Sequence, residues 1–241
     1  LVRSRGLGDV YKRQILCVKK EYRHSGYGKH LLIMAEGFIS ANYDEVILGG
    51  SGLLQGVPCD NDEESSVPFF EKRGYSADFI SVNMGLELND KAVEKLKEIP
   101  RPNGVTYRFA DDNDREKLLA AVKDAQAEWL PVFEENSDAP VLLAVCGDEI
   151  AGFEMVEEYG GMFFSDNEKH SMIGCVGVTH KYRRRGIGLA MTAEGSLSLY
   201  EKNCKDIQLL YVERVAWYNK LGYEVTSRQW MGRKKIQDIM F

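Results

Sequence analysis

The segment KYRRRGIGLAMT, residues 181–192, and its counterpart EYRHSGYGKHLL, residues 21–32, decide the fold of this 241-residue chain. In each segment an apolar, β-like run precedes an RxxGxG turn, and an amphipathic helical pattern follows it. The matching glycines Gly26 and Gly186 lie 160 positions apart, far beyond the period of a solenoid repeat. The sequence therefore predicts a duplicated domain rather than a repeat array.

The glycine-spaced turn has the composition of a phosphate-binding site. Gly186 and Gly188 lack the Cβ atoms that would keep an anion away from the backbone N–H groups. The helix that follows would present unpaired N–H groups and the positive end of its dipole. Arg183, Arg184 and Arg185 add donors suited to phosphate oxygens. A pyrophosphate would fit there, although a tight turn with solvated arginines has much the same sequence.

A second short motif follows each turn: FFEKRGY from Phe69 and WYNKLGY from Trp217. Together the paired motifs resemble the GCN5-related N-acetyltransferase (GNAT) family. In that family a [QR]xxGx[GA] turn after the fourth strand binds the acetyl-CoA pyrophosphate, and a later helix ends in an aromatic residue followed by xKxGF or a close variant. The resemblance covers nearly all of the chain from Ile15 onward as two tandem copies, and it is specific for fold and cofactor rather than for substrate.

The resemblance implies an α/β (α+β) fold of two tandem GNAT-like domains, each with a mixed, mostly antiparallel central sheet flanked by helices. We expect a first domain over residues 15–90, a linker over 91–103 that ends in the helix-breaking PRPNG, and a second, complete domain over 104–241. The first copy has no room upstream of Arg23 for the strand, helices and hairpin that precede Arg183. Its domain is therefore truncated at the N-terminus, either because the chain is a fragment or because this is a half domain.

Residues 1–14, LVRSRGLGDVYKRQ, look like translated library-adaptor sequence. The segment lacks an initiating methionine and sustained apolar periodicity, and it carries several closely spaced basic residues. The alternative is a genuine basic arm that leads into the strand at Ile15. We exclude the segment from the prediction of the fold.

The resemblance also implies a set of cofactor-binding residues. Backbone N–H groups of Val176, Gly177 and Val178, on the strand before the second turn, would hold the acetyl carbonyl of acetyl-CoA. The pyrophosphate would contact the two turns. Their residues are Arg183, Arg184, Arg185, Gly186, Ile187 and Gly188 in the second copy, and Arg23, Gly26, Tyr27 and Gly28 in the first.

Acetyl transfer needs a deprotonated nucleophile, an oxyanion stabiliser and a proton donor for the departing thiolate. The resemblance places a tyrosine hydroxyl near the CoA sulfur, and Tyr218 occupies that position unless it is only a core aromatic residue. Phe70 occupies it in the first copy and has no proton to give, which indicates that the second copy is the active one. Glu154 is the candidate general base. Strand alternation would put Glu154 and Glu158 on one face and Glu157 on the other; solvated carboxylates, with water as the base, are the alternative.

Composition restricts the class of protein. A formal net charge of −6 argues against a dedicated nucleic-acid binder. The five cysteines are odd in number and scattered, without metal-ligand spacing, so we expect no metal site and a reduced, cytoplasmic protein. No apolar run approaches the roughly 20 residues that a membrane span needs, so we expect no membrane partner.

Two function classes fit these observations. The first is an acetyl-CoA-dependent N-acetyltransferase that acetylates a primary amine of a small molecule, polyamine or peptide, with Asp166 and Glu168 attracting a cationic acceptor. The second is a non-catalytic acetyl-CoA-binding or interaction module with degenerate GNAT domains. Open strand edges at the ends of the sheets would permit a homodimer. The sequence does not identify the acceptor or decide whether the first copy binds acetyl-CoA.

Overall fold

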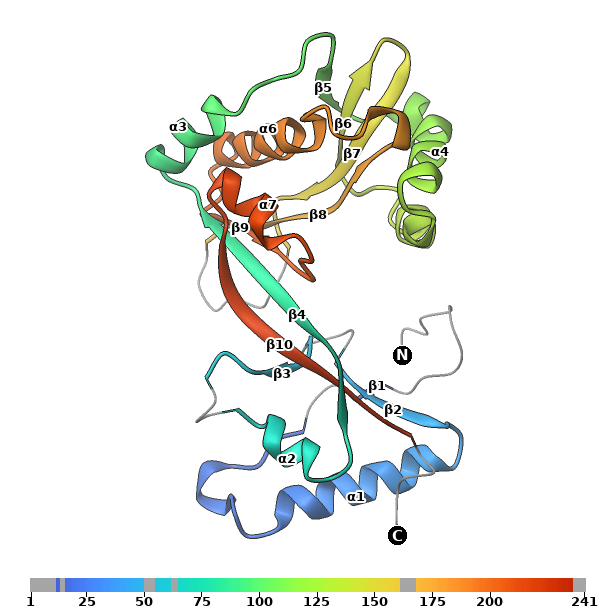
Figure 1. Ribbon diagram of the computed structural model, residues 1–241, viewed down its shortest axis with the longest axis vertical. Coiled ribbons are helices and arrows are strands. Elements are labelled where there is room, and N and C mark those ends of the chain that lie inside the picture. The colour runs from blue at the N-terminus through green and yellow to red at the C-terminus, as the bar shows by residue number, and fades with distance from the viewer. Residues whose placement is uncertain (1–11, 14–15, 50–54, 62–64, 161–167, 236–241) are drawn as a thin grey trace. The chain divides into compact units, whose positions relative to one another are not determined.

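The computed structural model describes residues 12–13, 16–49, 55–61, 65–160 and 168–235 (Figure 1). Its contacts divide the chain into two compact units. Unit 1 comprises Leu1–Val82 and Ser227–Phe241, and unit 2 comprises Asn83–Thr226. Each unit is described by itself. The adaptor-like segment lies outside the described residues except for Lys12–Arg13, and so does Asp166.

Unit 1 combines three short strands and two helices with parts of two long strands. Its elements are β1 (Lys12–Arg13), a 3-10 turn (Lys20–Tyr22), α1 (Tyr27–Ser40), β2 (Glu45–Leu48), β3 (Val57–Pro58), α2 (Val67–Glu71), and most of β4 (Ser76–Glu87) and β10 (Glu224–Lys235).

Unit 2 contains the remaining elements. They are α3 (Asp90–Glu98), β5 (Thr106–Phe109), a 3-10 turn (Asp112–Asp114), α4 (Arg115–Gln126), a 3-10 turn (Ala127–Trp129), α5 (Leu130–Glu135), β6 (Val141–Cys146), β7 (Glu149–Glu157), β8 (His170–Val178), a 3-10 turn (His180–Tyr182), α6 (Ile187–Glu201), β9 (Asp206–Leu209), α7 (Val215–Tyr218) and a 3-10 turn (Asn219–Leu221).

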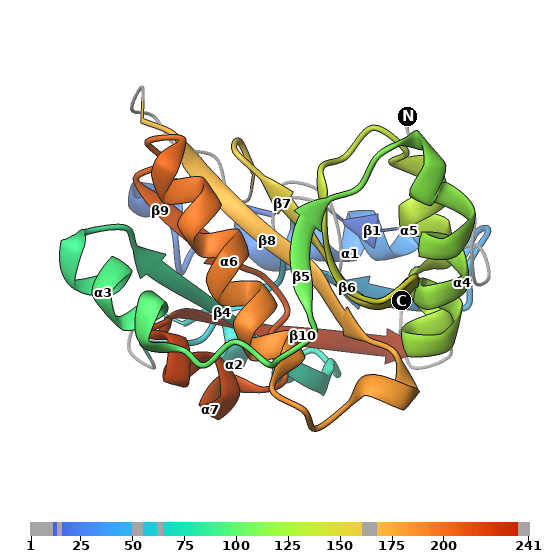
Figure 2. The same ribbon diagram turned by 90° about the horizontal axis from the view of Figure 1, so that it is seen from above.

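The sheet of unit 2 has the strand order β4-β9-β8-β7-β6-β5. Its pairs are antiparallel except for β8 and β9, which run parallel. Gly147, at φ 60°, makes the tight turn of the β6–β7 hairpin. Helix α6 packs on one face of the sheet, and α4 and α5 pack on the other (Figure 2). This is the mixed, mostly antiparallel sheet flanked by helices that the sequence predicts.

The main core of unit 2 lies between the sheet and helices α4 and α5. Phe153 of β7 is fully buried there and meets the ring of Phe133 edge to face, with 5.3 Å between ring centroids. The remaining members alternate along β6 and β7 or follow helical spacing: Leu118, Ala121, Val122, Ala125, Val141, Leu143, Ile150 and Met155. The residues between them, on the other face of β7, are therefore directed toward α6.

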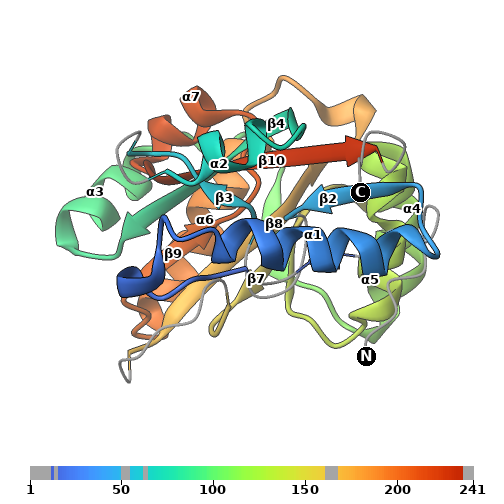
Figure 3. The same cartoon turned by 90° about the horizontal axis from the view of Figure 1, so that it is seen from below.

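Unit 1 is built around α1, which lies along β2 (Figure 3). Strand β2 pairs in parallel with β1 and antiparallel with β10. Leu32 and Ile39 of α1 are buried in the core, as predicted. Helical periodicity predicts a buried stripe of Leu31, Leu32, Ala35, Phe38 and Ile39 on this helix. Leu31 and Phe38 are 43% and 71% exposed, so that part of the prediction is wrong. The residue of α6 that matches Leu31 is Met191, which is buried against β7; unit 1 has no counterpart of β7 among its described residues.

Two strands run from one unit into the other. β4 follows the closing helix of the first copy, yet Met84–Glu87 pair with β9 in unit 2. β10 follows the closing helix of the second copy, yet Gly232–Lys235 pair with β2 in unit 1. Each unit is thus completed by a strand from the other half of the sequence. The domain limits expected from the sequence, 15–90 and 104–241, assign β4 wholly to the first copy and β10 wholly to the second, so they do not describe this exchange.

The expected linker over residues 91–103 also lies within unit 2. Most of α3 falls in it, and α3 contacts α6. Arg101 strengthens this packing, because its Nε donates to Glu194 Oε1 of α6 at 2.7 Å. The segment therefore covers a face of α6 and does not form a free connection.

A buried polar cluster holds β10 against α1 in unit 1. Tyr75 Oη donates to Glu36 Oε1 at 2.8 Å, and Lys234 Nζ lies 3.4 Å from the same oxygen. All three side chains are buried. Because a buried carboxylate is costly without partners, the cluster depends on the lysine that β10 delivers.

Candidate active site

The two RxxGxG turns have the same backbone conformation. Arg184 has φ 61° and Gly186 φ 79°, while in the first copy His24 has φ 61° and Gly26 φ 87°. Each turn thus places its second and fourth residues in the left-handed region, which only glycine adopts without strain. A helix begins at the next residue, with its first N–H groups unpaired by helical hydrogen bonds. The backbone fits an anion in both copies.

The second glycine of each turn serves packing. A Cβ at Gly188 would lie 3.2 Å from Val178 and 3.4 Å from Trp217, and one at Gly28 would lie 3.3 Å from the matching Phe69. The absence of a side chain lets the helix start rest on the preceding strand and on the closing helix. Packing thus accounts for the second glycine, and its proposed contact with an anion stays a prediction.

The first arginine of each turn holds the turn to its own strand. Arg183 Nε donates to Val178 O at 3.0 Å, and Arg23 Nε donates to Val18 O at 3.1 Å. In the second copy Arg183 Nη2 also donates to Ala125 O, at the end of α4. These bonds hold the exposed Arg183 against backbone carbonyls, and its contact with phosphate stays a prediction.

The next two arginines lie exposed at the turn. Arg184 and Arg185 are both on the surface, and the Arg185 guanidinium lies over the ring of Tyr182, 5.2 Å from its centroid. Ile187, the first helical residue, is buried and anchors α6. In the first copy the matching Tyr27 is exposed and packs edge to face on Tyr22. The charge available to an anion in the second copy therefore comes from Arg184 and Arg185.

Strand β8 opens away from β9 and carries a bulge next to the turn. The parallel pairing of the two strands covers only His170–Met172 on β8, so residues 173–178 have no β9 partner in the described pairing. On its other side the register shifts from Phe153↔Gly177 to Met155↔Gly174, which leaves an extra residue on β8. Cys175, in the bulge, has φ 50°, a strained conformation for a residue with a side chain. No motif in the sequence predicts this bulge.

Val176, Gly177 and Val178 form the end of β8, next to the bulge at Cys175, and lead into the turn. Gly177 is buried, and a Cβ there would overlap the ring of Phe153, so only glycine fits. Val176 and Val178 are half-buried. Gly177 and Val178 keep their register with Phe153 and Gly152 of β7, and on the other side the segment has no β9 partner in the described pairing, so backbone N–H groups on that side suit the expected contact with a carbonyl oxygen.

Tyr218 ends α7 close to the bulge. It is half-buried, with ring centroids 4.6 Å from Trp217 and 5.9 Å from Tyr223. Burial raises the pKa of its hydroxyl, and the charges of Glu154 and Cys175 add to the rise. Tyr218 therefore keeps its proton at neutral pH and lies within electrostatic reach of both residues.

Phe70 takes the same place in the first copy. Its ring lies edge to face against Phe69 at 5.1 Å and against Tyr75 at 5.6 Å. It is buried in the core of unit 1. The position is thus aromatic in both copies, and only the second copy has a hydroxyl there.

Glu154 lies beneath α6 and is 0% exposed. Thr192 Oγ1 donates to its Oε2 at 2.8 Å. Burial raises the pKa of this carboxyl to about 8, against the lowering effect of the Thr192 hydrogen bond. Glu158 pairs with Lys202, the residue after α6, at 2.9 Å, and Glu157 and Glu158 both line one cavity, so the expected alternation of these two side chains stays a prediction. Glu154 is not the solvated carboxylate that the alternative interpretation required.

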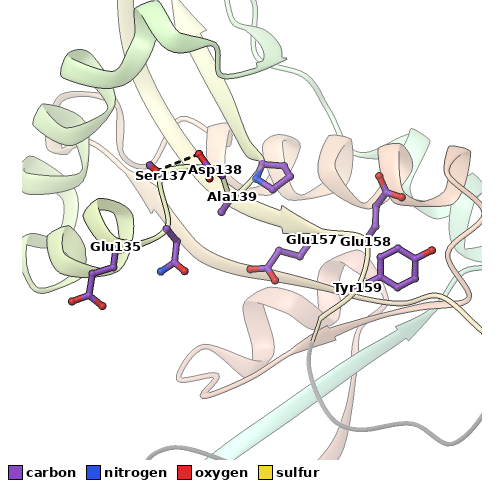
Figure 4. A pocket seen from close by; sticks show the side chains of 9 residues that line it. Glu135, Ser137, Asp138, Ala139, Glu157, Glu158 and Tyr159 are labelled. Carbon is purple, nitrogen blue, oxygen red and sulfur yellow. Dashed lines mark hydrogen bonds between the residues drawn. The ribbon is translucent and has the colours of Figure 1, made fainter. Parts of the chain in front are cut away.

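An acidic cavity of about 610 Å³ lies between the end of α5 and the end of β7 (Figure 4). It is lined by Glu135, Asn136, Ser137, Asp138, Ala139, Pro140, Glu157, Glu158 and Tyr159. Glu157 is half-buried, and burial raises its pKa. Burial and the nearby Glu157 together raise the pKa of the Cys175 thiol to about 11. The cavity therefore lies within electrostatic reach of the bulge.

Other kinds of site are absent from the part of the chain that the structure describes. No group of three or more His, Cys, Asp or Glu side chains there could hold a metal ion. Among the same residues, no helix combines the length and apolar character needed to cross a bilayer. All five cysteines are free thiols.

Solved structures with the same architecture are found at low sequence identity. One is the GCN5-related glucosamine N-acetyltransferase region of a fungal multi-domain GH3 β-N-acetylglucosaminidase, with a TM-score of 0.73 and 18% identity. A second is a GCN5-related N-acetyltransferase from Sphaerobacter thermophilus, with a TM-score of 0.67 and 23% identity over 91% of this chain and 71% of that one. The fold is that of the GCN5-related N-acetyltransferases.

The GNAT fold also occurs in tandem form. A tandem GNAT protein from the clavulanic acid biosynthesis pathway has a TM-score of 0.66 and 15% identity over 93% of this chain and 74% of that one. The match to the fungal enzyme covers 92% of this chain but only 29% of that protein. No protein-family model and no curated protein matches the sequence. The predicted resemblance to GNAT proteins is thus confirmed at the level of the fold.

Proposed function

We propose that this protein is a cytoplasmic, acetyl-CoA-dependent N-acetyltransferase that transfers an acetyl group to a primary amine, and that its active site lies in unit 2. The observation that carries this proposal is the bulge of β8. Near this bulge, unit 2 has a strand that opens away from its neighbour, a glycine turn suited to an anion, and the hydroxyl of Tyr218, all within a GNAT fold.

Groups suited to two parts of acetyl-CoA, the pyrophosphate and the acetyl carbonyl, support this proposal. The N–H groups at the start of α6, with exposed Arg184 and Arg185, suit the pyrophosphate. Backbone N–H groups of Val176–Val178 suit the acetyl carbonyl, where negative charge develops during transfer. Unit 1 repeats the turn but has Phe70 in place of the tyrosine. We propose that unit 1 has no transferase activity.

The proposed chemistry balances without a metal. The acceptor nitrogen bonds to the carbonyl carbon while the carbon–sulfur bond breaks. Tyr218 gives its proton to the departing thiolate and regains one, through water, from the nitrogen that becomes the amide. Because the pKa of Tyr218 is raised, its hydroxyl is protonated and available at neutral pH.

The acidic cavity favours a cationic amine as the acceptor. Glu135, Asp138, Glu157 and Glu158 line it, and lysine and arginine are absent from its lining in the described residues. Carboxylates concentrate an ammonium group there. Glu157 combines a place in the cavity with proximity to Cys175, so we propose that it accepts the ammonium proton, instead of Glu154.

The test is a comparison of Tyr218→Phe with the parent, using diamines as acceptors and Tyr211→Phe, an exposed tyrosine of unit 2, as the matched control. We expect Tyr218→Phe to lower kcat by about 10² or more, as loss of a general acid does, while calorimetry shows unchanged acetyl-CoA binding. Acetyl-CoA binding by the parent without turnover of any amine would support the non-catalytic module instead.

Glu157→Gln tests the acceptor part of the proposal separately. We expect a higher KM for a diamine, a lower kcat and unchanged acetyl-CoA affinity. If a neutral or anionic acceptor is used as well as a diamine, the acidic cavity does not select the acceptor.

A further inference from the structure

Glu154 is a buried acid without a compensating cation. Its Oε2 accepts from Thr192, while its Oε1 has no hydrogen-bond partner in the described part of the chain. Buried polar atoms are normally paired, so an orphaned carboxylate oxygen in a core requires an explanation. Burial of the Glu154 carboxyl disfavours its charged form relative to its neutral form.

The fold makes room for this carboxyl. A Cβ at Gly195 of α6 would overlap Glu154 Oε1, so a larger residue at this helical position would force the carboxyl of Glu154 to shift. The matching residue of α1 is Ala35, in a unit that has no counterpart of Glu154 among its described residues. An internal glycine costs a helix about 1 kcal/mol relative to alanine, so unit 2 gives up helix stability to accommodate the acid.

The carboxyl also lies at the point where β7 meets the irregular part of β8. The register shift between Phe153 and Met155 places Glu154 opposite the bulge at Cys175. Next to it, Ser196 Oγ donates to Thr192 O at 2.6 Å and lies 2.9 Å from Tyr223 Oη. Through Thr192 and Ser196, these bonds connect the carboxyl of Glu154 to Tyr223, against whose ring Tyr218 packs.

We propose that Glu154 is a positioning residue, whose carboxyl, held by Thr192 and accommodated by Gly195, supports the bulge at Cys175 in the geometry that receives the acetyl carbonyl. This inference rests on the proposed function. It differs from the general-base role expected from the sequence, because a fully buried carboxyl beneath α6 does not reach an acceptor in the cavity.

The protonation state follows from the surroundings. Among the described residues, Thr192 donates to Glu154, and the charge of Glu154 acts on Tyr218 and Tyr223; Arg214 acts on Tyr218, but no cation is among the groups that shift the pKa of Glu154. With its pKa raised to about 8, the carboxyl is neutral at pH 7. When it ionises, its charge raises the pKa of Tyr218 and weakens that residue as an acid.

The test uses the full chain with Glu154→Gln and Glu154→Ala, and it compares the binding of acetyl-CoA with that of CoA by calorimetry. Glutamine keeps the neutral shape, so we expect both affinities to remain. Alanine removes the support of the bulge, so we expect it to weaken acetyl-CoA by about tenfold, the loss of one hydrogen bond, and CoA by much less. Equal weakening of both ligands, or no weakening, would overturn the inference whether or not turnover is found.

Turnover supplies a second readout. We expect Glu154→Gln to keep kcat within about threefold of the parent at neutral pH. We expect the rate of the parent to decline as the pH rises through about 8, because Glu154 then ionises, and we expect Glu154→Gln to show no such decline. A fall of about 10² or more in kcat for Glu154→Gln at every pH would assign the general base to Glu154 and overturn the positioning role. Absence of turnover in the parent would refute the proposed function alone, since the binding comparison still decides the role of Glu154.

Discussion

Replacing Glu154 by glutamine should make unit 2 less sensitive to pH between about pH 5 and pH 8. The carboxyl has an ordinary pKa of 4.5 in the unfolded chain and a pKa of about 8 in the folded protein. Within this interval the folded state carries a proton that the unfolded state has lost. Stability therefore falls as the pH rises from the unfolded to the folded pKa, and it levels off above about 8.

The magnitude follows from the same two values. Each pH unit inside the interval corresponds to about 1.4 kcal/mol, so the full contribution of the shift from 4.5 to about 8 amounts to about 5 kcal/mol. Glutamine carries no ionisable proton. The free energy of unfolding of Glu154→Gln minus that of the parent should thus rise steadily from pH 5 to pH 8, on top of a constant offset from the amide at the Oε1 position.

Urea unfolding of both proteins at four pH values from 5 to 8 measures this difference. Glu158→Gln is the matched control, because Glu158 directly follows β7 but is paired with Lys169 and Lys202. These partners lower its pKa, so its contribution changes only below this range. A difference between Glu154→Gln and parent that stays constant from pH 5 to pH 8 would refute the account of a neutral buried acid.

Three further changes test the packing. Gly188→Ala should destabilise unit 2 by about 1–3 kcal/mol and weaken acetyl-CoA binding, because its Cβ presses on the strand before the turn; calorimetry and urea unfolding check both effects. Lys234→Ala should cost about 3–5 kcal/mol by leaving buried Glu36 unpaired, and Glu36→Gln in the same chain should restore part of that loss in urea unfolding. Met34→Glu with Phe38→Glu should reduce self-association in size-exclusion chromatography, since both side chains are more than 70% exposed on α1; an unchanged elution profile would contradict this.

The local part of the site could be predicted from the sequence, because backbone requirements are local. An RxxGxG turn with glycine at Gly186 predicts a left-handed residue and a helix start, and both are present. The role of Gly188 could not be predicted, because the space its Cβ would occupy is filled by Trp217, which lies 29 positions away. The bulge at Cys175 carries no sequence signal of its own, since its cause is the pairing with β7.

The partners of each element were harder to predict than the elements themselves. Alternation predicts that side chains of β7 point to two opposite faces. It does not predict that the face carrying Glu154 is covered by α6, which the contacts of Glu154 with Thr192 and Gly195 show. Likewise, the pattern of β10 predicts a strand without saying which strand it joins. Leu31 shows the same limit, because helical periodicity marks it for burial while the covering sheet is not among the described elements of unit 1.

The exchange of β4 and β10 makes the two copies inseparable as pieces of polypeptide. A protease cut in the segment between α3 and β5 would yield fragments in which Met84–Glu87 still belong to the sheet of unit 2 and Gly232–Lys235 to that of unit 1. Such a nicked protein should remain one particle until it is denatured. For the same reason, the loss of either copy, or its replacement by an unrelated domain, would remove a strand from the remaining sheet: β4 from unit 2 or β10 from unit 1. The first copy would therefore be retained even without transferase activity of its own, because the sheet of unit 2 includes its strand β4.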